Sequence, residues 1–185
     1  EYRMPAKFGS VKRCSVQKDP DSLKRNLNMY VISEDSFGKL IKSNSTIKNN
    51  LKTWLNNYRM ISDTLDILDP YILNFGITFM IKSKPGSNKF ATLYSALRAV
   101  RGYFSQNYYI GQSFSISDLY STLKDVPDVL DVLNVKVISK TGVGYSQAEI
   151  DINDNTSPDG DSIIIPNNAI VEIKFPEVDV VGKVK

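Results

Sequence analysis

Histidine is absent from this sequence, and cysteine occurs only once, at Cys14. Without histidine, neither a serine–histidine nor a cysteine–histidine catalytic pair can form, and imidazole acid–base chemistry is excluded. A single cysteine cannot form a disulfide within the chain and cannot by itself assemble a zinc site. The sequence therefore predicts neither a disulfide framework nor zinc chemistry, and we expect no cofactor and no metal.

Long apolar runs and long basic runs are missing too. No stretch reaches the roughly eighteen consecutive apolar residues that a membrane helix needs, so we expect no membrane contact. The 23 basic residues barely exceed the 20 acidic ones, and no basic run is longer than a dipeptide such as Lys12–Arg13. A nucleic-acid groove needs its lysines and arginines on one face, so this distribution disfavours nucleic acid as a partner.

The residues that are present predict a folded chain. Its length of 185 residues and hydrophobic content of 42% are enough for one core. We expect residues 1–19 to form an N-terminal arm or strand, residues 20–176 to form an α+β domain and residues 177–185 to be a C-terminal tail. Because the chain begins at Glu1, partway into a strand-like pattern, we expect it to continue a longer polypeptide.

Two periodicities run along the chain. Alternating or β-branched segments predict strands at residues 26–33, 71–81, 132–139 and 169–175. Two apolar stripes with helical spacing predict long helices, one starting at Ser45 and one capped by Ser87. The first stripe contains Ile47, Leu51, Trp54, Leu55 and Tyr58, and the second contains Phe90, Leu93, Leu97, Val100 and Phe104. A shorter helix should begin near Ser115 or Ser117 and end before Pro127. This order predicts an α+β fold with two long helices packed on one face of a mixed or antiparallel sheet.

Two groups of acidic residues invite a chemical interpretation. Residues 151–156 resemble the start of a calcium loop, but the sixth and twelfth positions hold Thr156 and Ser162 instead of the required glycine and glutamate. A solvated turn is the favoured interpretation. Asp63, Asp66 and Asp69 could support metal-dependent hydrolysis, but no nucleophile accompanies them, and a turn that ends the first helix is favoured.

Aromatic residues follow the second helix. The run from 103 to 110 (YFSQNYYI) offers tyrosines, which are common where proteins meet because they combine area with a polar tip. We therefore predict an interface at Tyr103, Tyr108, Tyr109 and Ile110, with core capping as the alternative. A nucleic-acid-binding α+β module would instead need strand aromatics such as Tyr30, Phe75 and Phe79 to face solvent.

Several motifs occur together in an order that is specific although each one is weak. They are Phe8–Arg13, Tyr30–Asp35, Leu51–Arg59, Ile67–Pro70, Tyr109–Gln112, Ser117–Leu119 and Val126–Val129. With these motifs the chain resembles, over nearly its whole length, the C-terminal part of the baseplate wedge subunit of T-even-like contractile-tailed bacteriophages, in the baseplate J-like family. Asp128 stands where J-like proteins commonly have glycine, which allows a different turn there.

The resemblance implies a structural role in the virion, at the tail baseplate. Such subunits are not enzymes. They pair with themselves as homodimers, join neighbouring wedges into a ring around the hub and contact other baseplate wedge proteins. We therefore expect wide interaction surfaces and no catalytic pocket.

Overall fold

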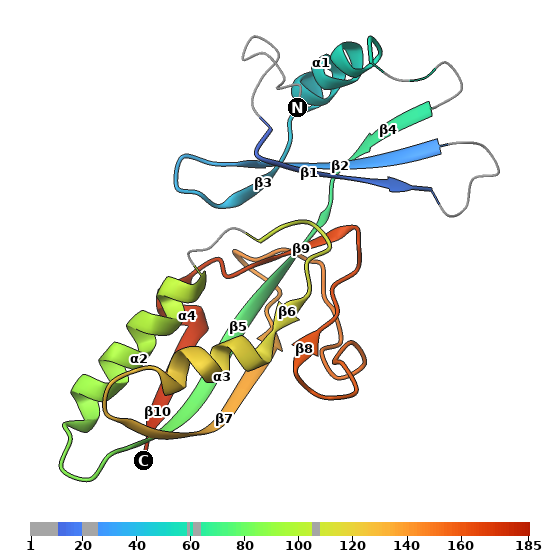
Figure 1. Cartoon of the computed structure of the whole chain (residues 1–185). Coiled ribbons are helices and arrows are strands. Elements are labelled where there is room, and N and C mark those ends of the chain that lie inside the picture. Colours follow the sequence, from blue (N-terminus) through green and yellow to red (C-terminus); the bar gives the residue numbers. More distant parts are fainter. Residues whose placement is uncertain (1–10, 20–25, 59, 61–63, 105–107) are drawn as a thin grey trace. The chain divides into compact units, whose positions relative to one another are not determined.

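The computed structural model describes residues 11–19, 26–58, 60, 64–104 and 108–185, and divides the chain into two compact units (Figure 1). Unit 1 comprises Glu1–Tyr71 with Tyr109–Gly111, and unit 2 comprises Ile72–Tyr108 with Gln112–Lys185. The expected single domain over 20–176 is thus replaced by two units. Each unit has its own open sheet and its own hydrophobic core.

Unit 1 is a small sheet with one helix. Its elements are β1 (Arg13–Lys18), β2 (Asn26–Glu34), β3 (Leu40–Lys42), α1 (Ser45–Leu55) and β4 (Thr64–Leu68). Strands β1 and β3 pair antiparallel with β2, whereas β4 pairs parallel with it. The core forms where Leu51 of α1 meets Met29 and Val31 of β2, with Trp54 packed beside them. Asn44, not Ser45, caps α1 by accepting a hydrogen bond from the amide of the second helical residue.

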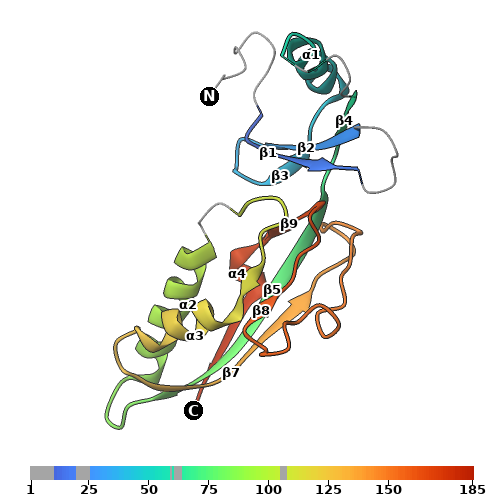
Figure 2. The same cartoon turned by 45° about the vertical axis from the view of Figure 1, so that its right-hand side comes forward.

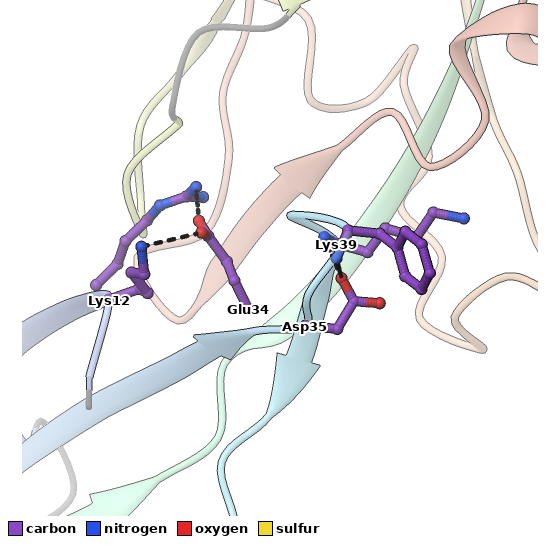
Figure 3. A network of polar contacts seen from close by, with 6 residues as sticks. Lys12, Glu34, Asp35 and Lys39 are labelled. Atoms are coloured by element: carbon purple, nitrogen blue, oxygen red, sulfur yellow. Dashed lines mark hydrogen bonds and ion pairs between the residues drawn. The ribbon is translucent and has the colours of Figure 1, made fainter. Parts of the chain in front are cut away.

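A polar network stabilises the end of β2 (Figure 3). The carboxylate of Glu34 pairs with Arg13, and its second oxygen lies 3.8 Å from Lys12 Nζ. Next to it, Asp35 accepts hydrogen bonds from the amides of residues 37 and 39, both at 2.8 Å, which closes the β2–β3 turn. Of the arm or strand expected over residues 1–19, the described part contains a strand, because β1 pairs with β2 along Arg13–Lys18.

Unit 2 contains the larger core. Its long strands are β5 (Tyr71–Ser83) and β7 (Val129–Ser139), its short strands are β9 (Ala169–Glu172) and β10 (Val180–Val184), and its helices are α2 (Lys89–Phe104), α3 (Ile116–Lys124) and α4 (Pro176–Asp179). The sheet order is β10–β5–β7, and β9 also pairs with β5. A separate pair is formed by β6 (Phe114–Ser115) and β8 (Ser162–Ile163). Figures 1 and 2 show α2 and α3 on the same face of the sheet.

The α+β class is confirmed, but the two long helices do not share a sheet. Helix α1 packs in unit 1, and the helix that accompanies α2 in unit 2 is the shorter α3. The buried residues of α2 are Thr92, Ala96 and Val100. Phe90, which the predicted stripe placed inside, is 83% exposed, so the buried face is rotated relative to the prediction.

The helix ends follow local side-chain chemistry. Asn88, not the expected Ser87, accepts hydrogen bonds from the first amides of α2 at 3.0 and 3.3 Å. Ser115 caps α3 as predicted by accepting from the amide of Asp118 at 3.1 Å. Helix α3 ends at Lys124, before Pro127, which agrees with the sequence-based expectation.

The expected C-terminal tail over 177–185 is part of the core instead. Residues Val180–Val184 form β10, which pairs parallel with β5 from Ile77 to Ile81. Val180 is 2% exposed, and a Cβ on Gly182 would lie 2.5 Å from Phe79 and 2.8 Å from Leu93. The Phe79 ring of β5 and the Leu93 side chain of α2 therefore pack so closely on Gly182 that a larger residue there would require them to shift.

The turn before β7 contains a non-glycine residue with a positive φ angle. Asp128 has φ 67°, in the left-handed region that glycine favours, and its carbonyl accepts a hydrogen bond from Lys84 N at 2.9 Å. A non-glycine residue in this region is uncommon, and aspartate is one of the side chains that tolerate it. Across the described ranges of the chain, no helix is long and apolar enough to cross a membrane.

Candidate interaction surfaces

The aromatic run after α2 packs mainly inward. Phe104 stacks on the fully buried Phe114 at 5.7 Å between ring centroids, and Tyr108 stacks on both rings. The hydroxyl of Tyr103 donates to Asp118 Oδ2 at 3.2 Å. Burial raises the pKa of Tyr103 and that of Tyr108 above their ordinary values. Tyr103 and Tyr108 therefore pack against the core of unit 2. This arrangement corresponds to core capping, the alternative to an interface that the sequence left open.

The other two predicted interface residues differ. Tyr109 is 66% exposed, and Ile110 is half-buried in a turn. Both cluster with unit 1, whereas Tyr103 and Tyr108 belong to unit 2. The four residues thus do not form one surface within one unit, and their role in an interface stays a prediction.

The acidic residues after α1 are matched by nearby partners. Asp69 lies 2.7 Å from Lys48 Nζ, and Asp66 lies 3.8 Å from Lys52 Nζ while accepting a hydrogen bond from Asn26. Asp63 lies outside the described residues. Asp66, Lys48, Lys52 and Asn26 line a polar groove of about 330 Å³ in unit 1. Within the ranges that the structure describes, no three metal-ligating side chains gather into a cluster.

The calcium-like segment forms turns. Asp151 Oδ1 accepts from the amide of Asn153 at 2.9 Å, and the Asp151 carbonyl accepts from both the backbone and the side chain of Asn155. The side chain that would begin a calcium loop is thus used to shape the backbone. The solvated turn favoured from the sequence describes this segment.

A buried polar network connects the sheet of unit 2 to its loops. The side chain of Asn74, fully buried on β5, donates to Glu172 at 2.9 Å and accepts from Ser146 N at 2.7 Å. Asp179, 2% exposed, accepts from the Tyr145 hydroxyl at 2.6 Å. This hydrogen bond, together with burial, raises the pKa of Tyr145 to about 12. Because the partners are up to 98 residues apart, local sequence patterns could not reveal the network.

One face of the unit 2 sheet carries no described helix. The register places Gly182 beside Phe79 on the face that α2 covers, so the neighbouring residues along each strand point to the opposite face. Val181, Thr78 and Lys136 form one row there, and Lys183, Met80 and Asn134 form the next. Val181 is 47% exposed, and Lys136 and Lys183 are exposed as well. We call this surface, together with Ile138 and Lys82, the open sheet face.

A groove follows one edge of the same sheet. Its walls are five consecutive residues of β7, 135–139, and the loop residues 149–153, with Ile116 at the start of α3, and its volume is about 540 Å³. The loop wall alternates, since Ile150 is buried whereas Glu149 and Asp151 are exposed. We call this feature the β7 groove.

Comparison with known proteins adds no further assignment to these surfaces. No protein-family model matches this sequence, and neither does any curated protein.

Proposed function

We propose that this chain is a structural, non-enzymatic subunit of a contractile phage tail baseplate, where it self-associates and joins neighbouring wedges into a ring around the hub. The observation that carries the proposal is the open sheet face. Apolar side chains from three strands, Met80, Ile138 and Val181, reach a surface that no described helix covers. Apolar groups rimmed by polar ones are typical of protein–protein contacts.

The positive charges on the open sheet face affect how two copies of the chain can associate. Lys82, Lys136 and Lys183 are exposed on or beside it, so two identical faces brought together would place lysine against lysine. A head-to-tail contact, in which this face meets a different surface bearing carboxylates, avoids that repulsion. Head-to-tail contacts close into rings when the rotation between copies allows it.

The alternative proposal is a nucleic-acid-binding α+β module. The lysines of the open sheet face, with Lys140 nearby, favour phosphate contact. Against it, Phe75 and Phe79 are at most 1% exposed, and the register puts no aromatic residue on the described part of that face. Base stacking, which strengthens single-strand binding, would have no platform there.

The test is light scattering of the chain over a concentration series. We expect the mass to rise above the monomer value of 20.8 kDa, and the substitution Val181→Glu to reduce that rise. The matched control is Phe90→Glu, which places the same charge on an 83% exposed residue of α2, away from the open sheet face. A constant monomer mass at every concentration contradicts self-association of this chain.

The alternative is tested in parallel. Anisotropy of a labelled single-stranded oligonucleotide should stay unchanged on adding the chain at physiological salt. Tight binding that weakens steeply with salt, and that is lost in Lys136→Ala with Lys183→Ala, would favour the nucleic-acid module instead.

A further inference from the structure

The outer edge of β7 has backbone groups that face away from the sheet. Lys140 N donates to the Asn74 carbonyl, so Lys140, and by alternation Ile138 and Lys136, direct their backbone groups toward β5. The residues between them, Val135, Val137 and Ser139, must therefore direct their amides and carbonyls outward. The hydrogen bond from Val135 N to the Tyr120 hydroxyl, at 3.1 Å, confirms this orientation.

Most of this outward edge is unpaired within the described residues. Among the described residues, the amide of Val135 is the one outward amide with a partner, and none of them forms a hydrogen bond with the amides of Val137 and Ser139. The hydroxyl of Ser139 is also buried, and no described residue is its hydrogen-bond partner. Natural sheets commonly protect such edges with proline, charge or a covering segment, because unpaired strand edges recruit other strands.

The β7 groove lies along this unpaired stretch. Residues 135–139 form one wall, so the outward amides and carbonyls line the groove. Five strand residues span about 17 Å at roughly 3.3 Å each, which matches an extended peptide of five to seven residues. The groove therefore has the length and the hydrogen-bonding groups of a strand-acceptor site.

The opposite wall defines the chemistry of the ligand. Ile116, Ile150 and Ile152 provide apolar contacts, and the exposed Glu149 and Asp151 add negative charge between them. Lys136 also lines the groove. Its side chain lies on the open sheet face, opposite the face that α2 covers. An extended segment with alternating apolar and basic side chains complements this wall.

We propose that the β7 groove binds an extended peptide segment of a partner protein, with alternating apolar and basic residues, as an added strand on β7. The proposal does not depend on the baseplate role, since it follows from unit 2 alone. It assigns the edge of the sheet to a linear segment, whereas the proposed self-association uses the open sheet face.

The first experiment uses a synthetic eight-residue peptide of alternating valine and lysine, labelled with fluorescein, and the full chain. We expect saturable binding by anisotropy. Methylation of alternate backbone nitrogens removes the donors along one peptide edge, so one of the two N-methylated series should bind at least about tenfold more weakly. A valine–glutamate peptide should bind more weakly than the lysine peptide, because its charges match those of Glu149 and Asp151.

The second experiment changes the protein. Ser139→Pro removes an amide that does not pair with β5, so the sheet is preserved, and peptide affinity should fall by about tenfold. The matched control, Ser139→Ala, retains the amide and should bind the peptide as the unaltered chain does. Circular dichroism establishes that both variants fold.

The results separate this proposal from the previous one. Equal binding of both N-methylated peptides and the unmodified peptide would overturn strand addition, as would unchanged affinity in a folded Ser139→Pro variant. Absence of any peptide binding, with concentration-dependent self-association intact, would reject the groove proposal alone. Peptide binding by a strictly monomeric chain would reject only the self-association.

Discussion

Substituting Gly182 with alanine tests the contact between α2 and β10. A Cβ at this position would lie 2.5 Å from Phe79 Cζ, 2.7 Å from Phe79 Cε2 and 2.8 Å from Leu93 Cδ1, whereas ordinary contacts begin at 3.4 Å. Phe79 is 1% exposed and cannot swing into solvent. The methyl group therefore requires the buried Phe79 ring and the end of the Leu93 side chain to shift within a packed core.

The expected cost follows from this overpacking. Adding a methyl group to a well-packed core costs about 1–3 kcal/mol, and the rigid surroundings of Gly182 favour a value near 2 kcal/mol. With a urea dependence of roughly 1–3 kcal/mol per molar, the midpoint should fall by about 1 M. Amides of β5 that exchange through global unfolding of unit 2 should exchange about thirtyfold faster.

The matched control is Lys183→Ala, one residue further on, where the side chain is exposed and belongs to the open sheet face. It should change stability by less than about 0.5 kcal/mol. A Gly182→Ala variant as stable as the control would show that Phe79 and Leu93 do not pack tightly on Gly182.

Three further outcomes are expected. Tyr145→Phe removes the donor to the buried Asp179 carboxylate and should cost about 2 kcal/mol near neutral pH. Because the pKa of Tyr145 rises from 10.0 to about 12 on folding, its contribution is complete below pH 10 and is lost toward pH 12, so urea titrations should show the two proteins converging over that window. Leu51→Ala should destabilise unit 1 by about 2–5 kcal/mol, as followed by Trp54 fluorescence. Ser115→Ala should remove the cap of α3 and cost about 1 kcal/mol in thermal unfolding.

Local patterns in the sequence were sufficient for most elements of this fold. The alternation over 26–33 and 132–139 corresponds to β2 and β7, and the cap and stop signals of α3 agree with its bounds. These features depend on side chains within a few residues of each other, so a single sequence contains them.

The missing features depend on distant pairing. Strand β4 was interpreted as part of a turn and β10 as a tail, because each has only five residues and pairs parallel with a strand far away in the sequence. The separation of α1 from α2 follows from the same pairings, since each helix packs on the sheet that they create. Parallel pairing leaves no turn signal between its strands.

The interaction surfaces were the least predictable part. An aromatic run suggested an interface, but Tyr103 and Tyr108 pack against Phe104 and Phe114. The sequence alone does not show whether such tyrosines cover the core or form an exposed patch, because this depends on the tertiary packing. The unpaired edge of β7 could not be recognised from residue types, because it consists of the backbone groups of β7 that do not pair with β5.

The parallel pairing of β10 with β5 has a mechanical consequence. Both strands run in the same direction, so the chain enters β5 at one end of the pair and leaves β10 at the other. A force that pulls the start of β5 away from Lys185 acts along the strands and loads their hydrogen bonds in shear, all at the same time. In an assembly that pulls on the chain at these two points, unit 2 would transmit the tension as a stiff link, whereas a hairpin pulled at its open end would unzip one bond after another.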